Sequence, residues 1–257
     1  MNIFSGSEKE EIKSVGLVFE PNFFTVYYYA DTAAKKPVGY DRKSRTETTD
    51  LAELKGYTPL FAVSFKPEWT LVPKSLFEED NAGSILAFNT EFEGEDVEWD
   101  EILGVDAIQI FGKDAYADNL VGKVFPGLRV THGARALIEF HRKSAELKSH
   151  TVIFQAENEW YITVFRDGKL LFANSINADY PEDVRYFLLY TFKQLQLKTD
   201  QKVVLLGEAV INLGLKNILE KYLRVEQPGK NKTLDSQLPT ETRARHWAGI
   251  YASQCAL

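Results

Sequence analysis

The sequence contains three evenly spaced histidines, and histidine is a residue type that can bind a metal. His132, His141 and His150 recur at intervals of nine residues, whereas two ligands on one helix face stand four residues apart. Cys255 is the only cysteine, and no histidine on a rigid element lies near it to activate its thiol. We therefore expect surface or capping histidines, no metal centre and no cysteine nucleophile.

A second group with chemical potential is a long run of carboxylates. Between Lys74 and Lys113 the chain has no basic residue. The acidic residues in this interval are Glu78, Glu79, Asp80, Glu91, Glu93, Glu95, Asp96, Glu98, Asp100, Glu101 and Asp106. Their spacing indicates no particular acid–base pair. Two interpretations stay open, a solvated acidic face or a docking face at residues 78–106 for a basic protein partner. Either surface repels nucleic-acid phosphates, so we expect no nucleic-acid partner.

Composition places the chain among ordinary globular proteins. It has 257 residues, 44% of them hydrophobic, which suffices for a core in one large domain or two smaller ones. The net charge of −7 is uneven, since residues 1–128 are acidic and residues 129–257 are slightly basic. The polar start, MNIFSGSEKEEIKS, lacks the apolar core of a signal peptide, and no run approaches membrane-span length. With a single cysteine, these features predict a soluble cytoplasmic protein without a membrane span.

The first half is predicted to open with a hairpin and then to alternate strands and helices. The turn sequence EPN separates its first two β-rich runs, and the polar stretch 31–50 reads as loop. The expected strands are 15–19, 23–29, 59–65, 68–73 and 105–111, and the expected helices are 74–89, 113–126 and 131–147.

The second half opens with a three-stranded meander over 152–172, broken at QAENE and RDGK. A helix over 179–197 follows, then a strand ending at Gly207, a helix over 211–223, a short strand or exit segment from 224 and a terminal helix over 246–256. The helix over 179–197 has one apolar face through Val184 and Leu188, and Tyr186 and Tyr190 make its opposite face apolar too. We therefore expect this helix to be covered on both sides.

The two halves show a weak internal repeat. GLVFEPNFFTVYYY and VIFQAENEWYITVF both have an asparagine in the turn, Asn22 and Asn158, and a threonine further on, Thr25 and Thr163. This repeat predicts a duplicated, two-lobed α/β architecture.

A meander followed by α-β-α-β, present twice, resembles the actin-like ATPase fold, in which two ribonuclease H-like lobes flank a cleft. The segments LVPKSLFEE, FPGLRVTH, ENEWYITVFRDGKLLFANSI, DVRYFLLYTFKQLQL and VVLLGE are similar to an uncharacterised Bacteroidetes family with this fold. The resemblance implies lobes at 1–128 and 129–257 and an ATP cleft between them.

The resemblance also implies where nucleotide contacts would lie. Active members of the superfamily carry Asp-x-Gly in the first hairpin turn, a comparable turn in the second lobe, and a strand ending in Gly-Gly beside the adenosine. Backbone N–H groups in such turns hold phosphate because glycine permits close approach. The candidate positions here are Asn22, Asn158, Gly207 and Glu208.

This sequence departs from that pattern at all three places. FEPNFF has neither Asp nor Gly, and Pro21 lacks an N–H. QAENEW has no Gly, and Trp160 stands where a phosphate would need space. LLGEA keeps Gly207 but has Glu208 in place of the second glycine. We therefore expect a non-catalytic interaction or scaffold protein without a cofactor, the alternative being an ATP-binding protein or weak ATPase that uses Mg-ATP in the cleft.

Overall fold

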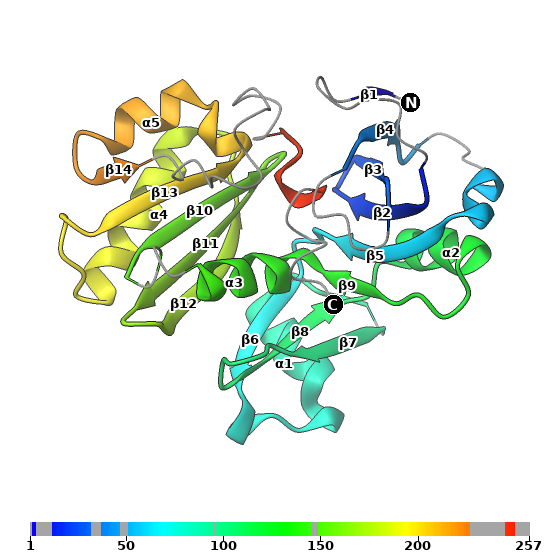
Figure 1. Cartoon of the computed structure of the whole chain (residues 1–257). Coiled ribbons are helices and arrows are strands. Elements are labelled where there is room, and N and C mark those ends of the chain that lie inside the picture. The colour runs from blue at the N-terminus through cyan, green and yellow to red at the C-terminus, as the bar shows by residue number, and fades with distance from the viewer. Residues whose placement is uncertain are drawn as a thin grey trace. The chain divides into compact units, whose positions relative to one another are not determined.

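Each half of the chain folds into a mixed β-sheet with helices packed on its faces (Figure 1). The computed structural model describes residues 2–3, 12–31, 37–46, 51–94, 96–144, 147, 149–226 and 245–249. Two compact units result, one comprising Met1–Ala136 with Ala248–Leu257 and the other Leu137–Trp247. These units do not test the predicted lobe boundary between residues 128 and 129, which stays a prediction. Within the described residues, no helix is long and apolar enough to cross a membrane.

The first unit contains a six-stranded sheet with the order β1-β4-β3-β2-β5-β9. Its strands are β1 Asn2–Ile3, β2 Ser14–Phe19, β3 Phe23–Tyr29, β4 Gly39–Ser44, β5 Thr58–Ser64 and β9 Val130–His132. β2, β3 and β4 pair antiparallel, whereas β5 pairs parallel with both β2 and β9. One face packs against α2, Ala115–Val124, because its apolar residues meet the alternate side chains Val15, Leu17 and Phe19 of β2.

β4 lies in the stretch predicted to be loop, so that prediction is wrong there. Its sequence, GYDRKS, has no β-branched residue and few apolar ones. Tertiary pairing to β3 decides its conformation rather than local propensity.

A three-stranded sheet is inserted after β5, with the order β6-β8-β7. Its strands are β6 Trp69–Pro73, β7 Val97–Glu101 and β8 Ala107–Gly112. β7 was not predicted, although Val97 and Trp99 alternate with charged residues and face α1, Ala82–Asn89. The helix predicted over 74–89 is wrong in its first half, where two separate 3-10 turns precede α1. The apolar and acidic residues of that half have no helical period.

The predicted helix over 131–147 also begins differently. Thr131 and His132 end β9, and α3 spans Gly133–Lys143. Gly133 fits here because an added Cβ would lie 2.3 Å from the Phe65 ring.

The second unit confirms the predicted meander. Its strands are β10 Thr151–Ala156, β11 Glu159–Arg166, β12 Lys169–Asn177, β13 Lys202–Gly207 and β14 Arg224–Glu226, in the order β12-β11-β10-β13-β14. Asp167 and Gly168 form the predicted second turn, and both have positive φ, 52° and 76°. β13 pairs parallel with β10 and β14, so both units share the plan of an antiparallel meander extended by parallel strands.

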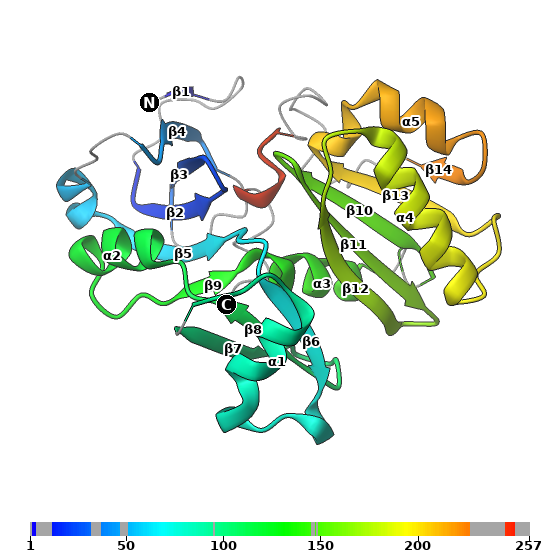
Figure 2. The ribbon, with the colours of Figure 1, turned by 180° about the vertical axis from the view of Figure 1, so that it is seen from behind.

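Helices cover both faces of this second sheet. α4 Pro181–Gln194 and α5 Leu213–Leu219 share a core with Ile153, Ile162 and Val164 of the sheet (Figure 2). On the opposite face, His141 of α3 contacts Thr163 and Phe165 of β11. Of the predicted terminal helix, only residues 245–249 belong to the described part of the chain.

Candidate functional site

The turn between β2 and β3 uses its own backbone groups. The Glu20 N–H donates to Phe23 O at 2.8 Å, and Pro21 has no N–H. Arg45 Nη1 donates to Glu20 O at 3.0 Å, and Arg42 Nη2 lies 3.1 Å from the Glu20 carboxylate. Arg42 also stacks 4.4 Å from the centre of the Phe23 ring. The turn is thus closed by its own contacts and carries a carboxylate where a phosphate-binding turn presents glycine amides.

The turn between β10 and β11 is likewise tied to its surroundings. Glu157 has a φ of 53°, and the Asn158 side chain donates to Asp179 Oδ1 at 2.9 Å. Asn158 O accepts from the Ala178 N–H at 3.0 Å, and Trp160 Nε1 donates to Ala178 O at 3.0 Å. Trp160 is buried in the core. The β11 end of the turn is therefore held to the segment that follows β12.

Gly207 is required by packing and by its backbone conformation. Its φ is 62°, and an added Cβ would lie 2.4 Å from the Phe154 ring and 2.6 Å from Gln155 O. β10 and β13 pair in parallel with Gln155 opposite Gly207, so both strands end at the same edge of the sheet. Glu208 is the residue directly after Gly207, and Asn158 lies in the turn directly after β10.

The structure thus brings Asn158, Gly207 and Glu208 to one edge of the second unit's sheet. Asn22 occupies the corresponding turn of the first unit, where its carbonyl oxygen accepts the Arg45 N–H at 3.0 Å. That any of the four contacts a nucleotide stays a prediction.

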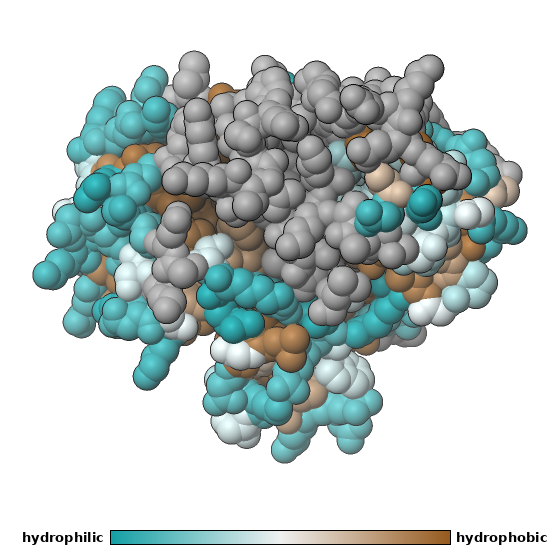
Figure 3. Space-filling view, viewed as in Figure 1, coloured by the Kyte–Doolittle hydropathy of each residue, from teal (hydrophilic) through white to brown (hydrophobic). Residues whose placement is uncertain are grey.

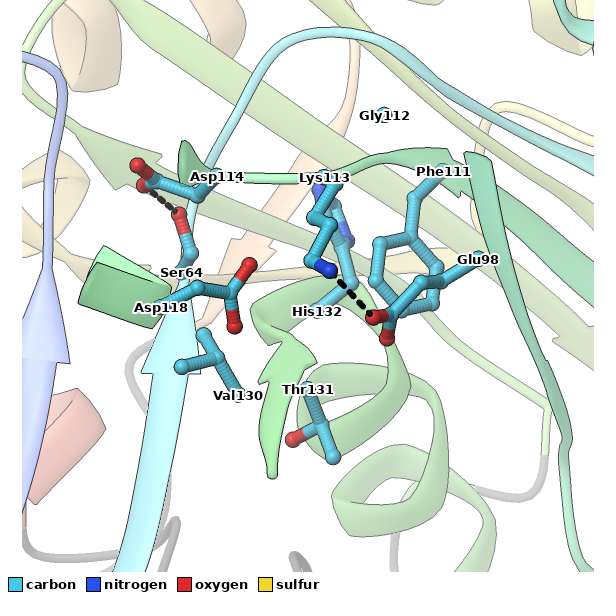
Figure 4. A pocket seen from close by; sticks show the side chains of 10 residues that line it. All are labelled: Ser64, Glu98, Phe111, Gly112, Lys113, Asp114, Asp118, Val130, Thr131 and His132. Atoms are coloured by element: carbon cyan, nitrogen blue, oxygen red, sulfur yellow. Dashed lines mark hydrogen bonds and ion pairs between the residues drawn. The ribbon is translucent and has the colours of Figure 1, made fainter. Parts of the chain in front are cut away.

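A pocket lies in the first unit where β5 and β9 end (Figure 4). The pocket is small, with a cavity volume of about 10 Å³, which is room for about one water molecule. Its walls are formed by Ser64, Glu98, Phe111, Gly112, Lys113, Asp114, Asp118, Val130, Thr131 and His132. The carboxyl ends of parallel strands are the usual location of ligand sites in α/β sheets, because the connecting segments open there.

Asp114 anchors one side of this pocket. Its side chain caps α2 by accepting the Ala117 N–H at 3.1 Å. The other oxygen accepts Ser64 Oγ at 2.5 Å, and Arg45 Nη2 pairs with Asp114 Oδ1 at 2.5 Å. Asp114 is buried, and its charge is compensated by these contacts, so its role is structural.

Asp118 is the carboxylate of this pocket that can take part in chemistry, in contrast to the paired Asp114. It lies one turn after Asp114, is half-buried, and points toward the pocket interior in Figure 4. Burial raises its pKa, and the negative charges of Glu98 and Asp114 raise it further against the opposing charge of Lys113. Lys113 Nζ lies 3.9 Å from Glu98 Oε1, a loose ion pair. A carboxylate in this state can accept a proton or a cationic group, whereas a phosphate would meet like charge.

Two acids of the segment 78–106, Glu98 and Asp100, form ion pairs with arginines further along the chain. Arg129 Nη2 lies 2.9 Å from Glu98, and Arg129 Nη1 lies 2.5 Å from Asp100. Arg135 adds a second contact to Asp100 at 3.4 Å. Burial raises the pKa of Asp100, and the two arginines oppose that shift. These carboxylates hold β7 to the start of α3 and to the segment before β9.

The remaining acids of the segment are exposed. They are Glu78, Glu79, Asp80, Glu91, Glu93, Asp96, Glu101 and Asp106, of which Glu101 pairs with Lys74, while Glu95 lies outside the described residues. Figure 3 shows a largely hydrophilic surface around this three-stranded sheet, with small hydrophobic groups in it. Leu76, Phe88 and Leu103 are exposed in the same region.

His132 is a capping histidine, one of the two predicted alternatives, and it is buried rather than at the surface. Its Nε2–H donates to Lys66 O at 2.7 Å, and Nδ1 accepts from Gln109 Nε2 at 2.8 Å and from the Ala134 N–H at 3.2 Å. The contact to Ala134 is a capping contact to α3, as predicted. Burial lowers the His132 pKa to about 4.

His141 is also buried, against the prediction. Nε2–H donates to Leu147 O at 2.9 Å, and Nδ1 accepts from Thr163 Oγ1 at 2.7 Å. Burial lowers the His141 pKa to about 3. Among the described residues, no group of three His, Cys, Asp or Glu side chains is placed to hold a metal.

The pocket residues were not singled out from the sequence. The available signal was the pair Asp114 and Asp118, four residues apart at the start of a helix that follows a buried strand. Such a position marks both a helix cap and a sheet edge. Ser64 and Thr131 carried no local signal, because only strand pairing brings β5 and β9 together.

Comparison with solved structures identifies the fold. A Bacteroides thetaiotaomicron protein with an actin-like ATPase fold and unknown function matches with a TM-score of 0.68 at 20% identity, over 95% of this chain and 98% of that chain. A chain of a PilM–PilN type IV pilus biogenesis complex matches with a TM-score of 0.56 at 13% identity, over 95% and 99%. The ethanolamine utilization protein EutJ from Carboxydothermus hydrogenoformans matches with a TM-score of 0.50 at 11% identity, over 99% and 92%. The protein therefore has the actin-like ATPase fold.

The sequence itself identifies the family. Residues 43–225 match the family described as protein of unknown function (DUF3822), and the chain belongs to that family. No curated protein sequence matches this chain.

Proposed function

We propose that this protein is a non-catalytic interaction or scaffold protein built on an actin-like ATPase fold that has lost its phosphate contacts. The observation that carries the proposal is the chemistry of the β2–β3 turn. A phosphate-binding turn aims several backbone N–H groups at one point. Here Pro21 has no N–H, the Glu20 N–H is bonded to Phe23 O, and the Glu20 carboxylate stands at the turn.

The second turn supports the same conclusion. Glu157 and Asn158 replace glycines, and Asn158 is bonded through both its side chain and its carbonyl oxygen. Glu208, beside Gly207, adds a further carboxylate at that edge. Carboxylates repel a triphosphate, and the repulsion grows in partly buried surroundings.

The partner we propose is a basic segment of another protein that docks on the exposed acids of residues 78–106. Residues 78–106 themselves contain no basic residue, and of their exposed carboxylates Glu101 pairs with Lys74. Complementary charge of this kind speeds association and selects partners. A fold relative occurs in a PilM–PilN complex, so the fold is compatible with a role in protein assembly. The proposal places the protein in the cytoplasm, in keeping with its single cysteine.

The alternative is an ATP-binding protein or weak ATPase. Gly207 at the end of β13 favours it, since a glycine at this strand end matches the adenosine position implied by the fold. The packing of Phe154 and Gln155 against Gly207 explains the same glycine without a nucleotide.

Calorimetric titration of Mg-ATP into the purified protein tests the proposal, together with thermal melting. A ligand at a hundred times its Kd stabilises the native state by about 2.7 kcal/mol, which would raise the melting temperature by several degrees. We expect neither heat of binding nor a shift at millimolar Mg-ATP. A saturable signal with micromolar affinity would establish the alternative.

Docking is tested separately by affinity capture of partners from lysate. Glu91→Lys with Glu93→Lys should release a bound basic protein, whereas the control Glu53→Lys with Asp200→Lys should retain it. Salt of about 0.5 M should also release it, because the Debye length falls to about 4 Å. A partner that survives both treatments would show that the acidic face is only solvated.

A further inference from the structure

Four exposed tyrosines lie on α4, just before it and just after α5. Tyr180, Tyr186, Tyr190 and Tyr222 are between 49% and 71% exposed. We call these four residues the tyrosine surface. The rings of Tyr186 and Tyr190 stack with centroids 6.5 Å apart and planes 15° from parallel. The Arg185 guanidinium lies 5.9 Å from the centre of the Tyr222 ring. Tyrosine and arginine are the residue types that dominate binding energy at protein interfaces.

The outer face of α4 is left without a cover in the described part of the chain. Val184, Leu188 and Phe192 bury the inner face in the core, as their spacing predicts. The sequence also predicted a covered outer face, and that prediction is wrong within the described residues, because Tyr186 and Tyr190 stay exposed. A helix that is apolar on both faces but covered on one is suited to association with another molecule.

The charges on the same face indicate what covers it. Asp183 lies one turn before Tyr186, and Lys193 lies about one turn after Tyr190, both exposed. At 3.6 residues per turn, these four side chains share one stripe of the helix. The stripe reads acid, tyrosine, tyrosine, base from its N-terminal to its C-terminal end.

This order is self-complementary when two such helices run antiparallel. A two-fold axis passing beside Leu188 places Asp183 against Lys193 of the second copy, and the reverse pair forms at the other end. The same axis places Tyr186 against Tyr190 of the second copy. A parallel arrangement would instead oppose like charges. We infer that the tyrosine surface binds a second copy of this chain, with the two α4 helices antiparallel. Such an isologous interface closes as a dimer.

Sedimentation equilibrium of the full chain tests the inference. At about 5–200 μM, a range suited to a small interface, the wild type should show a reversible monomer–dimer equilibrium. Tyr186→Ala with Tyr190→Ala should weaken the dimer about tenfold or more, because interface tyrosines carry much of the binding energy. Phe88→Ala, which removes an even more exposed aromatic side chain in the first unit, should leave the equilibrium unchanged. A monomeric wild type, or a dimer that survives the tyrosine changes, would overturn the inference.

A charge swap tests the antiparallel register. Asp183→Lys and Lys193→Asp should each weaken the dimer, since each creates two like-charge contacts. The double variant should restore it, since the opposite charges face each other again. Circular dichroism and melting curves establish that each variant is folded. Both residues are exposed, so the fold should persist. Failure of the double variant to recover affinity would refute the register, whether or not a nucleotide binds elsewhere.

Discussion

Lowering the pH from 7 to 5 should destabilise this protein through two buried histidines. His132 and His141 are neutral in the folded state, because the carbonyl oxygens of Lys66 and Leu147 accept their Nε2–H groups. Each Nδ1 is held as an acceptor, by Gln109 and Ala134 in one case and by Thr163 in the other. A proton added to Nδ1 would face the N–H or O–H group that now donates to this nitrogen. It would also place a positive charge in the core.

The sign follows from the two pKa values. Burial lowers the pKa of His132 to about 4 and that of His141 to about 3, whereas unfolded histidine titrates near 6.5. The unfolded chain therefore takes up the protons first as the pH falls. The stabilisation is complete above about pH 6.5 and is lost progressively down to the folded pKa of each histidine. Between pH 7 and pH 5 the loss is about 2 kcal/mol for each histidine.

Denaturant unfolding and NMR titration measure this loss. The two residues belong to different compact units, so single variants report on each separately. His141→Gln should be less stable at pH 7 but should lose about 2 kcal/mol less than the wild type between pH 7 and pH 5, and His132→Gln should behave likewise. The wild-type imidazole resonances should stay unchanged down to pH 5. An imidazole that titrates above pH 6, or equal pH slopes in variant and wild type, would refute the reasoning.

Three further changes address the pocket and the strand end. Asp114→Ala removes a helix cap and the ion pair of the partly buried Arg45, so it should cost about 2–4 kcal/mol in chemical denaturation, and Asp114→Asn, which keeps the cap, should cost less. A loss under 1 kcal/mol for the alanine variant would contradict the anchoring role. Gly207→Ala places a Cβ against the Phe154 ring at positive φ and should cost about 2–4 kcal/mol, whereas an unchanged melting temperature would show that the site relaxes freely. Asp118→Asn removes a partly buried charge and its repulsion with Glu98 and, after solvent screening, should stabilise the protein by a few tenths of a kcal/mol, and a destabilised variant would reveal a partner for this carboxylate.

The sequence predicted well the parts of the fold that depend on neighbours along the chain. The meander over 152–172 and its Asp167–Gly168 turn follow from alternating apolar residues and turn chemistry. α4 begins at Pro181, two residues after the predicted start, since proline suits the first helical turn. The duplicated plan followed from the repeat and the family resemblance.

Pairing between distant segments decided the rest. β4 and β7 are strands because β3 and β8 pair with them, and their own composition favours loops. His132 is buried because Trp69 and Phe111 pack against its ring, and His141 because Phe165 and Thr163 do, which a spacing of nine residues does not reveal.

The same distinction holds for the candidate sites. Asn22, Asn158, Gly207 and Glu208 could be named from the sequence, because each follows a recognisable strand or turn. The pocket could not, since Ser64, Glu98, Asp118 and Thr131 come from segments up to 67 residues apart. Local chemistry determined which turns lack phosphate-binding groups. Only the parallel pairing of β5 with β9 and the antiparallel pairing of β7 with β8 placed the half-buried Asp118 beside Glu98, because side chains so distant along the chain meet only through tertiary contacts.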